Sequence, residues 1–232
     1  GTLGFIAEVV YRTVIEHRHQ ASVLMYFPDI RTACEATIIL GKQPVAAAEL
    51  MDRASLASVT GKPGMPEFLG ELGPKVTAVL VETRAETADT LEAQIGQIRA
   101  ALSGVETVRP IEFTAIPEEF NQLWKIRKGL FPAVGAVRRT GTTVIIEDVA
   151  FPIEHLADAT LDLQELLLRY KYTEAIIFGH ALAGNLHFVF TQDFSTEAEV
   201  VRYRDLMDDV VKMVLEKYDG SLKAEHGTGR NM

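Results

Sequence analysis

The sequence predicts an α+β fold in which helices pack on an antiparallel sheet. Short apolar segments typical of strands alternate with longer segments whose apolar residues recur every three or four positions, as in amphipathic helices. The order strand, helix, strand occurs twice in the first half of the chain. Near the end, two strands are separated by only a short turn, which favours antiparallel pairing. Together these features indicate a ferredoxin-like antiparallel sheet with helices packed on it.

The first half of the chain divides into two strand-helix-strand units. A Gly- and Pro-rich passage over residues 60–74 separates them. In the second unit, Leu91, Ile95, Ile98 and Leu102 lie on one face of the predicted helix. The first unit comprises residues 23–27, 31–40 and 46–51, and the second comprises residues 76–82, 91–102 and 107–113.

The second half adds further strands and helices, of which the final helix has the clearest signals. Thr196 and Glu199 form a capping box at its start, apolar residues follow at helical spacing as far as Val214, and Gly220 is expected to be the left-handed residue that ends it. The preceding elements are expected at residues 120–130 (helix), 143–151 (strand), 155–170 (helix), 175–180 (strand) and 185–190 (strand).

Composition excludes several classes of protein. The chain of 232 residues contains no apolar run of the roughly 18 residues that a membrane span needs and no signal peptide, so we expect a cytoplasmic protein. The net charge of −9, without a clustered basic stripe, argues against nucleic acid as a partner. Cys34 is the single cysteine, which excludes an internal disulfide, and its apolar helical setting predicts a buried structural thiol.

The histidine-containing hairpin over residues 178–187 is the most informative stretch. If its turn is centred between Ala183 and Gly184, His180 lies directly opposite His187 on one face of the sheet, with Cβ atoms about 4.5–5.5 Å apart. Two imidazoles at that spacing can bind one divalent ion, and a carboxylate is the usual third ligand. Glu225, in the polar segment after the final helix, is the candidate. A stacked or hydrogen-bonded histidine pair with a solvated Glu225 is the alternative.

Two pairs of basic residues are candidates for binding an anionic substrate. Arg127 and Lys128 follow Trp124 on a predicted helix, and Arg138 and Arg139 lie in a loop. A guanidinium group matches a carboxylate bidentately and stays charged at any relevant pH. The functional interpretation requires at least one of these side chains to turn inward, whereas the alternative is that all of them are solvated.

Three motifs together resemble a known family. They are Gly1-Thr2-Leu3-Gly4-Phe5, the hairpin Gly179-His180 through Gly184-Asn185-Leu186-His187, and Glu225-His226-Gly227-Thr228-Gly229-Arg230. Their order is similar to that in FAD-linked oxidases of the vanillyl-alcohol-oxidase type. The branch containing D-lactate dehydrogenase, the glycolate oxidase flavin subunit and D-2-hydroxyglutarate dehydrogenase is the most similar. The resemblance covers essentially the whole chain.

The resemblance implies a domain organisation. In that family an N-terminal domain binds FAD and a cap domain covers the flavin and supplies much of the substrate site. Residues 1–20 would be the last strand or strands of a truncated FAD-binding domain, with residues 5–14 as a strand and Gly1, Thr2 and Gly4 at the cofactor. Residues 21–220 would be the cap domain, and residues 221–232 a segment returning toward the flavin. This chain alone is expected to hold no FAD and to be inactive.

The resemblance also assigns roles to residues. It implies that His180, His187 and Glu225 bind zinc, manganese or iron, that His226 is the acid/base, that Asn185 lies beside the substrate and that Arg127 holds its carboxylate. A lysine typical of the D-2-hydroxyglutarate members is missing from residues 144–148, so a second carboxylate would need Arg138 or Arg139.

The expected function is the oxidation of a small D-2-hydroxy acid such as lactate, glycolate or 2-hydroxyglutarate to the 2-oxo acid. The partners are the substrate and the missing FAD domain. The electron acceptor, a homodimer and a peripheral location on the inner face of the membrane stay open. The alternatives are a non-catalytic ferredoxin-like metal-binding module and a metal hydrolase, in which the same ligands would activate water.

Overall fold

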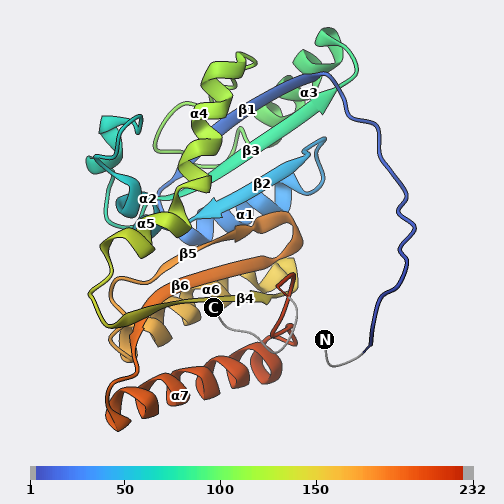
Figure 1. The fold of residues 1–232 in the computed structure, drawn as a ribbon. Coiled ribbons are helices and arrows are strands. Elements are labelled where there is room, and N and C mark those ends of the chain that lie inside the picture. The colour runs from blue at the N-terminus through green and yellow to red at the C-terminus, as the bar shows by residue number, and fades with distance from the viewer. Residues whose placement is uncertain (1–3, 227–232) are drawn as a thin grey trace.

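The computed structural model describes residues 4–226, which form one six-stranded sheet covered by helices (Figure 1). The strands are β1 (His19–Phe27), β2 (Ala47–Met51), β3 (Thr77–Ala85), β4 (Thr142–Ala150), β5 (Ile176–His180) and β6 (Asn185–Asp193). The helices are α1 (Ile30–Leu40), α2 (Arg53–Val59), α3 (Ala88–Ala101), α4 (Pro117–Lys128), α5 (Leu130–Val137), α6 (Leu156–Arg169) and α7 (Glu197–Lys212). Shorter turns are η1 (Glu67–Gly70), η2 (Ile153–His155), η3 (Ala181–Ala183) and η4 (Met213–Lys217).

The sheet consists of two similar halves. Its strand order is β1-β3-β2-β5-β6-β4, and every neighbouring pair is antiparallel. In each half a strand, a helix and a second strand are followed by a third strand that inserts between the first two, and then by a helix. This is the split β-α-β arrangement of ferredoxin-like folds, and the α+β prediction is confirmed. The halves are β1-α1-β2-β3-α3 and β4-α6-β5-β6-α7, joined where β2 pairs with β5.

The prediction for the second unit, residues 76–113, is therefore wrong in its last element. The strand expected at residues 107–113 is not formed. Instead, the chain runs along the edge strand β1 with a hydrogen bond from Val108 N to Tyr26 O of 2.7 Å and an isolated bridge between Ser22 and Thr114. Pro110 lies within this segment, and because proline lacks an N–H group it interrupts a regular ladder.

Helices cover both faces of the sheet, because the strands alternate apolar side chains toward each face. One core contains residues of α1, α3, α6 and α7 packed on strand residues such as Leu50 and Phe188. The other contains residues of α2, α4 and α5 packed on strand residues such as Phe178 and Val189. Figure 1 shows α1 and α6 on one side and α4 and α5 on the other. Cys34 is buried in the first core, as predicted.

The N-terminal segment differs from its prediction. Residues 5–14 form no strand, and the segment extends away from the sheet with Phe5, Val10, Tyr11 and Val14 exposed (Figure 1). A strand requires a neighbouring strand for its backbone hydrogen bonds, and the described part of the chain offers none to this segment. β1 begins only at His19.

The end of α7 also differs from its prediction. The helix continues into the wider turn η4, and the left-handed residue is Asp219, with φ of 50°, instead of Gly220. Gly220 is required for another reason, since a Cβ atom there would lie 2.5 Å from the carbonyl oxygen of Ala150. The backbone at Gly220, where the segment after α7 begins, thus lies close to the end of β4. Within residues 4–226, no helix combines the length and apolarity needed to cross a membrane.

Candidate active site

The hairpin of β5 and β6 places both histidines on the sheet face covered by α4. Phe178, not His180, lies opposite His187, so the predicted register is wrong by two residues. A shift of two residues keeps every side chain on its face, because side chains alternate with a period of two. The two imidazoles consequently still meet, with ring centroids 5.4 Å apart and planes at 88°.

Two glycines make this tight hairpin possible. Gly184 has a φ of 65°, and a Cβ atom there would lie 1.9 Å from the carbonyl oxygen of Phe151. At Gly179 a Cβ atom would lie 2.1 Å from the carbonyl oxygen of Asn185. The turn between the histidines is therefore held closely against neighbouring backbone, which fixes the direction in which both strands present their side chains.

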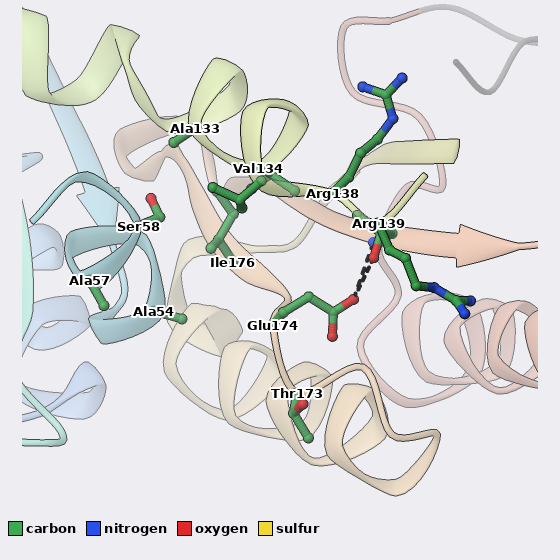
Figure 2. Close-up of a pocket in the computed structure, with 12 residues that line it drawn as sticks. Ala54, Ala57, Ser58, Ala133, Val134, Arg138, Arg139, Thr173, Glu174 and Ile176 are labelled. Carbon is green, nitrogen blue, oxygen red and sulfur yellow. Dashed lines mark hydrogen bonds between the residues drawn. The ribbon is translucent and has the colours of Figure 1, made fainter. Parts of the chain in front are cut away.

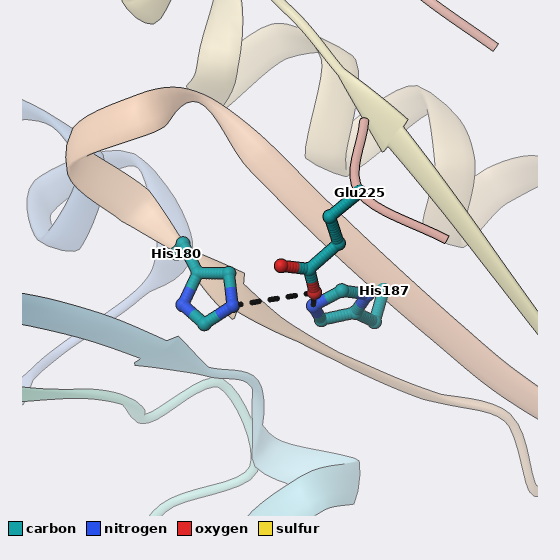
Figure 3. Close-up of side chains that lie close together, drawn as sticks. All are labelled: His180, His187 and Glu225. Carbon is teal, nitrogen blue, oxygen red and sulfur yellow. Dashed lines mark ion pairs between the residues drawn. The ribbon is translucent and has the colours of Figure 1, made fainter. Parts of the chain in front are cut away.

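Glu225 completes a three-residue cluster with the histidines (Figure 3). Its Oε1 atom lies 3.0 Å from His187 Nε2 and 3.4 Å from His180 Nε2. One ligand atom from each of the three residues lies within 4.8 Å of the others. These are the three residues that the sequence predicted as metal ligands, and two imidazole nitrogens with a carboxylate could hold a divalent cation.

Glu49 holds the other side of His180. In the β2–β5 pairing it lies directly opposite His180, and its Oε1 atom is 2.7 Å from His180 Nδ1. This hydrogen bond raises the pKa of His180 above its usual value, against the opposing effect of partial burial. The second carboxylate oxygen of Glu49 accepts a hydrogen bond of 2.8 Å from Arg127 Nε. One buried carboxylate thus contacts both a histidine of the cluster and the predicted substrate arginine.

His187 is buried, in contrast to His180. Burial lowers its pKa to about 4, so the imidazole is neutral at neutral pH and Nε2 can act as a lone-pair donor. The ring of His226 stacks on that of His187, with centroids 5.0 Å apart and planes at 11°. His226 Nε2 also lies 3.4 Å from Glu225 Oε1. The predicted acid/base residue is therefore in contact with the predicted ligands.

Strand β4 holds the segment that carries Glu225 and His226. Asp148 Oδ2 accepts backbone hydrogen bonds from Ala224 (2.8 Å), Glu225 (2.6 Å) and His226 (3.3 Å). Burial by itself would raise the pKa of Asp148, but these three hydrogen bonds bring it below its usual value. Lys223 Nζ lies 2.5 Å from Glu147 Oε2 on the same strand. Contacts with β4 thus hold residues 221–226, the described part of the segment after α7.

Arg127 faces the cluster through Glu49, and Asn185 lies on the same face of β6 as His187, two residues before it. The Arg127 side chain is 14% exposed, and its guanidinium group lies 4.4 Å above the Phe178 ring, whereas Lys128 on the same helix is exposed. Asn185 is buried at the start of β6, and its Oδ1 atom has no hydrogen-bond partner among the described residues. The inward-facing basic residue is therefore Arg127.

Arg138 is not brought together with these residues. It lines a separate cavity of about 630 Å³ with Val134, Ile176 and Arg139 (Figure 2). Its guanidinium group donates to the carbonyl oxygens of Gly135 and Thr142, and in Figure 2 it points away from Ile176. Its role toward a second substrate carboxylate stays a prediction.

The predicted cofactor contacts lie mostly beyond the described residues. Gly1, Thr2 and residues 227–232 fall outside them. Gly4 is exposed, with no atom within 4 Å of the position of a Cβ atom.

Sequence reasoning missed Glu49, Glu147 and Asp148. Each is a buried acidic residue in an otherwise apolar strand. Carboxylates are rarely buried unless they are paired, so an acidic residue inside an apolar run was the available signal.

Comparison with known proteins places this geometry in a family context. The family model for "FAD linked oxidases, C-terminal domain" matches residues 16–232. The chain is 25% identical over 233 residues to the glycolate oxidase subunit GlcD of Bacillus subtilis, which covers 99% of this chain and 47% of that protein. It is 32% identical over 110 residues to a D-2-hydroxyglutarate dehydrogenase of Xanthomonas citri pv. viticola, covering 47% and 22% respectively. The chain thus spans less than half the length of these relatives.

Solved structures show the same fold. The alkyldihydroxyacetonephosphate synthase superimposes with a TM-score of 0.62 at 16% identity, covering 89% of this chain and 40% of that one. The 4-ethylphenol oxidase of Gulosibacter chungangensis superimposes with a TM-score of 0.59 at 15% identity, covering 87% and 45%. Because the family model matches nearly all of the sequence, the chain belongs to the FAD-linked oxidases, as a C-terminal domain of that family.

Proposed function

We propose that this chain is the metal- and substrate-binding cap domain of an FAD-dependent enzyme that oxidises a D-2-hydroxy acid to the 2-oxo acid. The observation that carries the proposal is the convergence of His180 Nε2, His187 Nε2 and Glu225 Oε1 beside Arg127 and His226. The relatives support the substrate class, since their names refer to glycolate and D-2-hydroxyglutarate. Family membership supports FAD as the cofactor.

The donor set suits a divalent metal ion. Two ligands at about 2.1 Å from a tetrahedral ion are about 3.4 Å apart, close to the separations of Glu225 Oε1 from the two histidine nitrogens. A ligating histidine commonly donates its other ring N–H to a carboxylate, and His180 contacts Glu49 in this way. Three protein ligands leave a position for substrate, and nitrogen with oxygen donors favours zinc, manganese or iron(II). Such an ion would lower the pKa of a hydroxyl group that it binds.

The residues around the cluster supply the remaining functions. Arg127 would bind the substrate carboxylate with its terminal N–H groups, and the Asn185 amide would hydrogen-bond to the substrate beside it. His226 would take the hydroxyl proton. Asp148 Oδ1, 3.6 Å from His226 Nδ1, would stabilise the imidazolium that results. The flavin would supply the hydride-accepting chemistry.

The flavin site would lie between this chain and a further domain. We infer that residues 1–20 belong to the FAD-binding domain, where Gly1, Thr2 and Gly4 would contact the cofactor and the exposed apolar residues 5–14 would pair as a strand. Residues 221–232 would return toward the flavin. The exposure of Phe5, Val10, Tyr11 and Val14 supports this inference, because side chains of this kind are normally covered by packing.

Anaerobic reduction of the flavin tests the proposed function. The full-length protein is mixed with glycolate, D-lactate or D-2-hydroxyglutarate without oxygen, and the flavin absorbance is followed. At least one of these acids is expected to bleach it, and the corresponding ester, which lacks the carboxylate for Arg127, is not. A flavin that none of the acids reduces, in a protein that holds stoichiometric metal, would favour a non-catalytic metal-binding module.

A further inference from the structure

Glu49 lies between the two halves of the site. It is in the middle of the β2 segment, its side chain is only 7% exposed, and its two oxygens have different partners, His180 Nδ1 and Arg127 Nε. We propose that Glu49 is a positioning residue that orients the substrate-binding arginine and the metal-binding histidine at once. This inference rests on the proposed function.

The effect on Arg127 follows from which nitrogen Glu49 occupies. Glu49 accepts from Nε, and the Phe178 ring lies against the guanidinium plane at 4.4 Å. The bond and the ring together fix both the direction and the tilt of the group. The terminal nitrogens Nη1 and Nη2 then form a fork at the end of the side chain, the arrangement that binds a carboxylate bidentately. Without Glu49 the guanidinium group could rotate about its last side-chain bonds.

The effect on His180 follows from the same geometry. An ionised carboxylate only accepts hydrogen bonds, so its contact of 2.7 Å requires the proton of His180 to be on Nδ1. In the neutral ring Nε2 then carries the lone pair, and Nε2 is the atom that faces Glu225. Glu49 thereby selects the tautomer that can bind a metal.

Glutamine has the same shape as glutamate but cannot replace it here. Both partners of Glu49 are donors, Arg127 Nε–H and His180 Nδ1–H. A glutamine side chain offers one acceptor oxygen and one NH₂ donor, so it can satisfy only one of them. If the amide group faces His180, it favours the wrong tautomer, and if it faces Arg127, two donors confront each other. Glu49→Gln thus tests the hydrogen-bond pattern at nearly constant volume.

Glu82 provides a matched control. It lies on the neighbouring strand β3, on the same face of the sheet, and its side chain is 6% exposed. It too contacts an arginine, with Arg84 Nε at 2.6 Å, and it accepts from Gln20 at 2.6 Å. Glu82→Gln removes the same charge from an equally buried place that has no contact with the histidine cluster among the described residues. It therefore measures the cost of the substitution without the positioning effect.

The experiment uses the full-length flavoprotein and the 2-hydroxy acid that the wild type oxidises best. Metal content is measured by elemental analysis, and KM and kcat by steady-state kinetics, for wild type, Glu49→Gln and Glu82→Gln. Glu49→Gln is expected to raise KM and lose most of the metal, with kcat/KM lower by about 10- to 100-fold, as is typical when an outer-shell partner is lost. Glu82→Gln is expected to stay within about twofold of wild type in both readouts, as expected for a change with no contact to the site.

The outcomes separate this inference from the proposed function. A wild type that has neither metal nor hydroxy-acid activity overturns both. An active, metal-containing wild type with an unchanged Glu49→Gln variant overturns only the role of Glu49, as does a change confined to KM or to metal content. If Glu49→Gln does not fold by circular dichroism, Glu49→Asp decides, since it keeps the charge but is one methylene shorter. Unchanged KM and metal content in that variant would contradict positioning, and a loss in both would support it.

Discussion

The two halves of the sheet end in the same way but carry different chemistry. After α3, residues 108–114 return along the edge strand β1 and bridge to it through Ser22 and Thr114. After α7, the chain returns to the edge strand β4 and bridges to it through Ala150 and Ser221. The first return segment brings no histidine to the sheet, whereas the second delivers Glu225 and His226 to His180 and His187.

This difference shows that the scaffold alone does not make a site. The first half buries two glutamates that each contact an arginine: Glu82 contacts Arg84, and Glu49, which lies at the junction with the second half, contacts Arg127. Only the second half adds two strand histidines and an acidic anchor, Asp148, that fixes the returning chain. The proposed function would then depend on three contacts between segments that are distant in the sequence. These are the contacts of Glu225 and His226 with the two histidines, of Asp148 with the returning chain, and of Glu49 with Arg127. A separate substitution can break each of them.

The largest effect is expected at His226, a residue of the second return segment that has no counterpart in the first. His226→Ala in the full-length enzyme is expected to lower kcat by about 10²- to 10⁴-fold, since general acid–base groups contribute on that scale. Metal content is expected to stay at the wild-type value, because the proposed ligands are retained. Steady-state kinetics with elemental analysis checks both parts. Loss of metal would mean that His226 is itself a ligand.

Substitution of Asp148, which anchors the second return segment to β4, is expected to release that segment. Asp148→Asn removes the charge that accepts three backbone hydrogen bonds, and hydrogen bonds to charged groups contribute about 1.5–3 kcal/mol. We expect the free energy of unfolding in urea at pH 7 to fall by a value in that range. An unchanged midpoint and slope would show that the segment is held by other contacts.

The same anchor predicts a pH dependence with a definite sign. The pKa of Asp148 is lowered in the folded protein, so its stabilisation is present above the unfolded value of about 3.9 and is lost as the pH falls through the lowered folded value. The difference in stability between wild type and Asp148→Asn should therefore be full at pH 7 and shrink below about pH 4. Urea unfolding of both proteins across this range measures it, and a difference that grows toward acid pH would refute the assignment.

A smaller effect is expected at the arginine. Arg127→Lys keeps the charge but loses the bidentate fork and the Nε contact with Glu49, so KM for the hydroxy acid is expected to rise by about tenfold, equivalent to about 1.4 kcal/mol. Lys128→Ala, on the exposed side of the same helix, is the control and should change KM little. Equal effects at both positions would place the wrong face of α4 at the substrate.

The smallest effect is expected in the first return segment. Thr114→Pro removes the N–H group that donates to Ser22 O at 2.9 Å and is expected to cost about 1 kcal/mol of stability. Metal content and kcat/KM of the full-length enzyme should remain at wild-type values. Loss of metal in this variant would show that the two halves are coupled more closely than their contacts indicate.

Periodicity predicted most helices and strands because their apolar faces are continuous in the sequence. The helix α5 was missed, since its segment Leu130–Val137 contains proline and glycine and has no clear polar face. The shared face of His180 and His187 could be predicted because any loop with an even number of residues places strand residues an odd number of positions apart on one face of the sheet. Glu49 and Asp148 could not, since their partners lie 131 and 77 residues away in the sequence and come together only through the sheet order.

His180, His187 and Glu225 are the proposed ligands of a divalent metal ion that would leave a position open for the substrate. Elemental analysis of the full-length protein carrying both His180→Ala and His187→Ala tests this site most directly, with Glu82→Gln as a folded control. We expect stoichiometric zinc, manganese or iron in the wild type and the control, and none in the double variant, while circular dichroism stays unchanged. Full metal occupancy in the folded double variant would contradict the site.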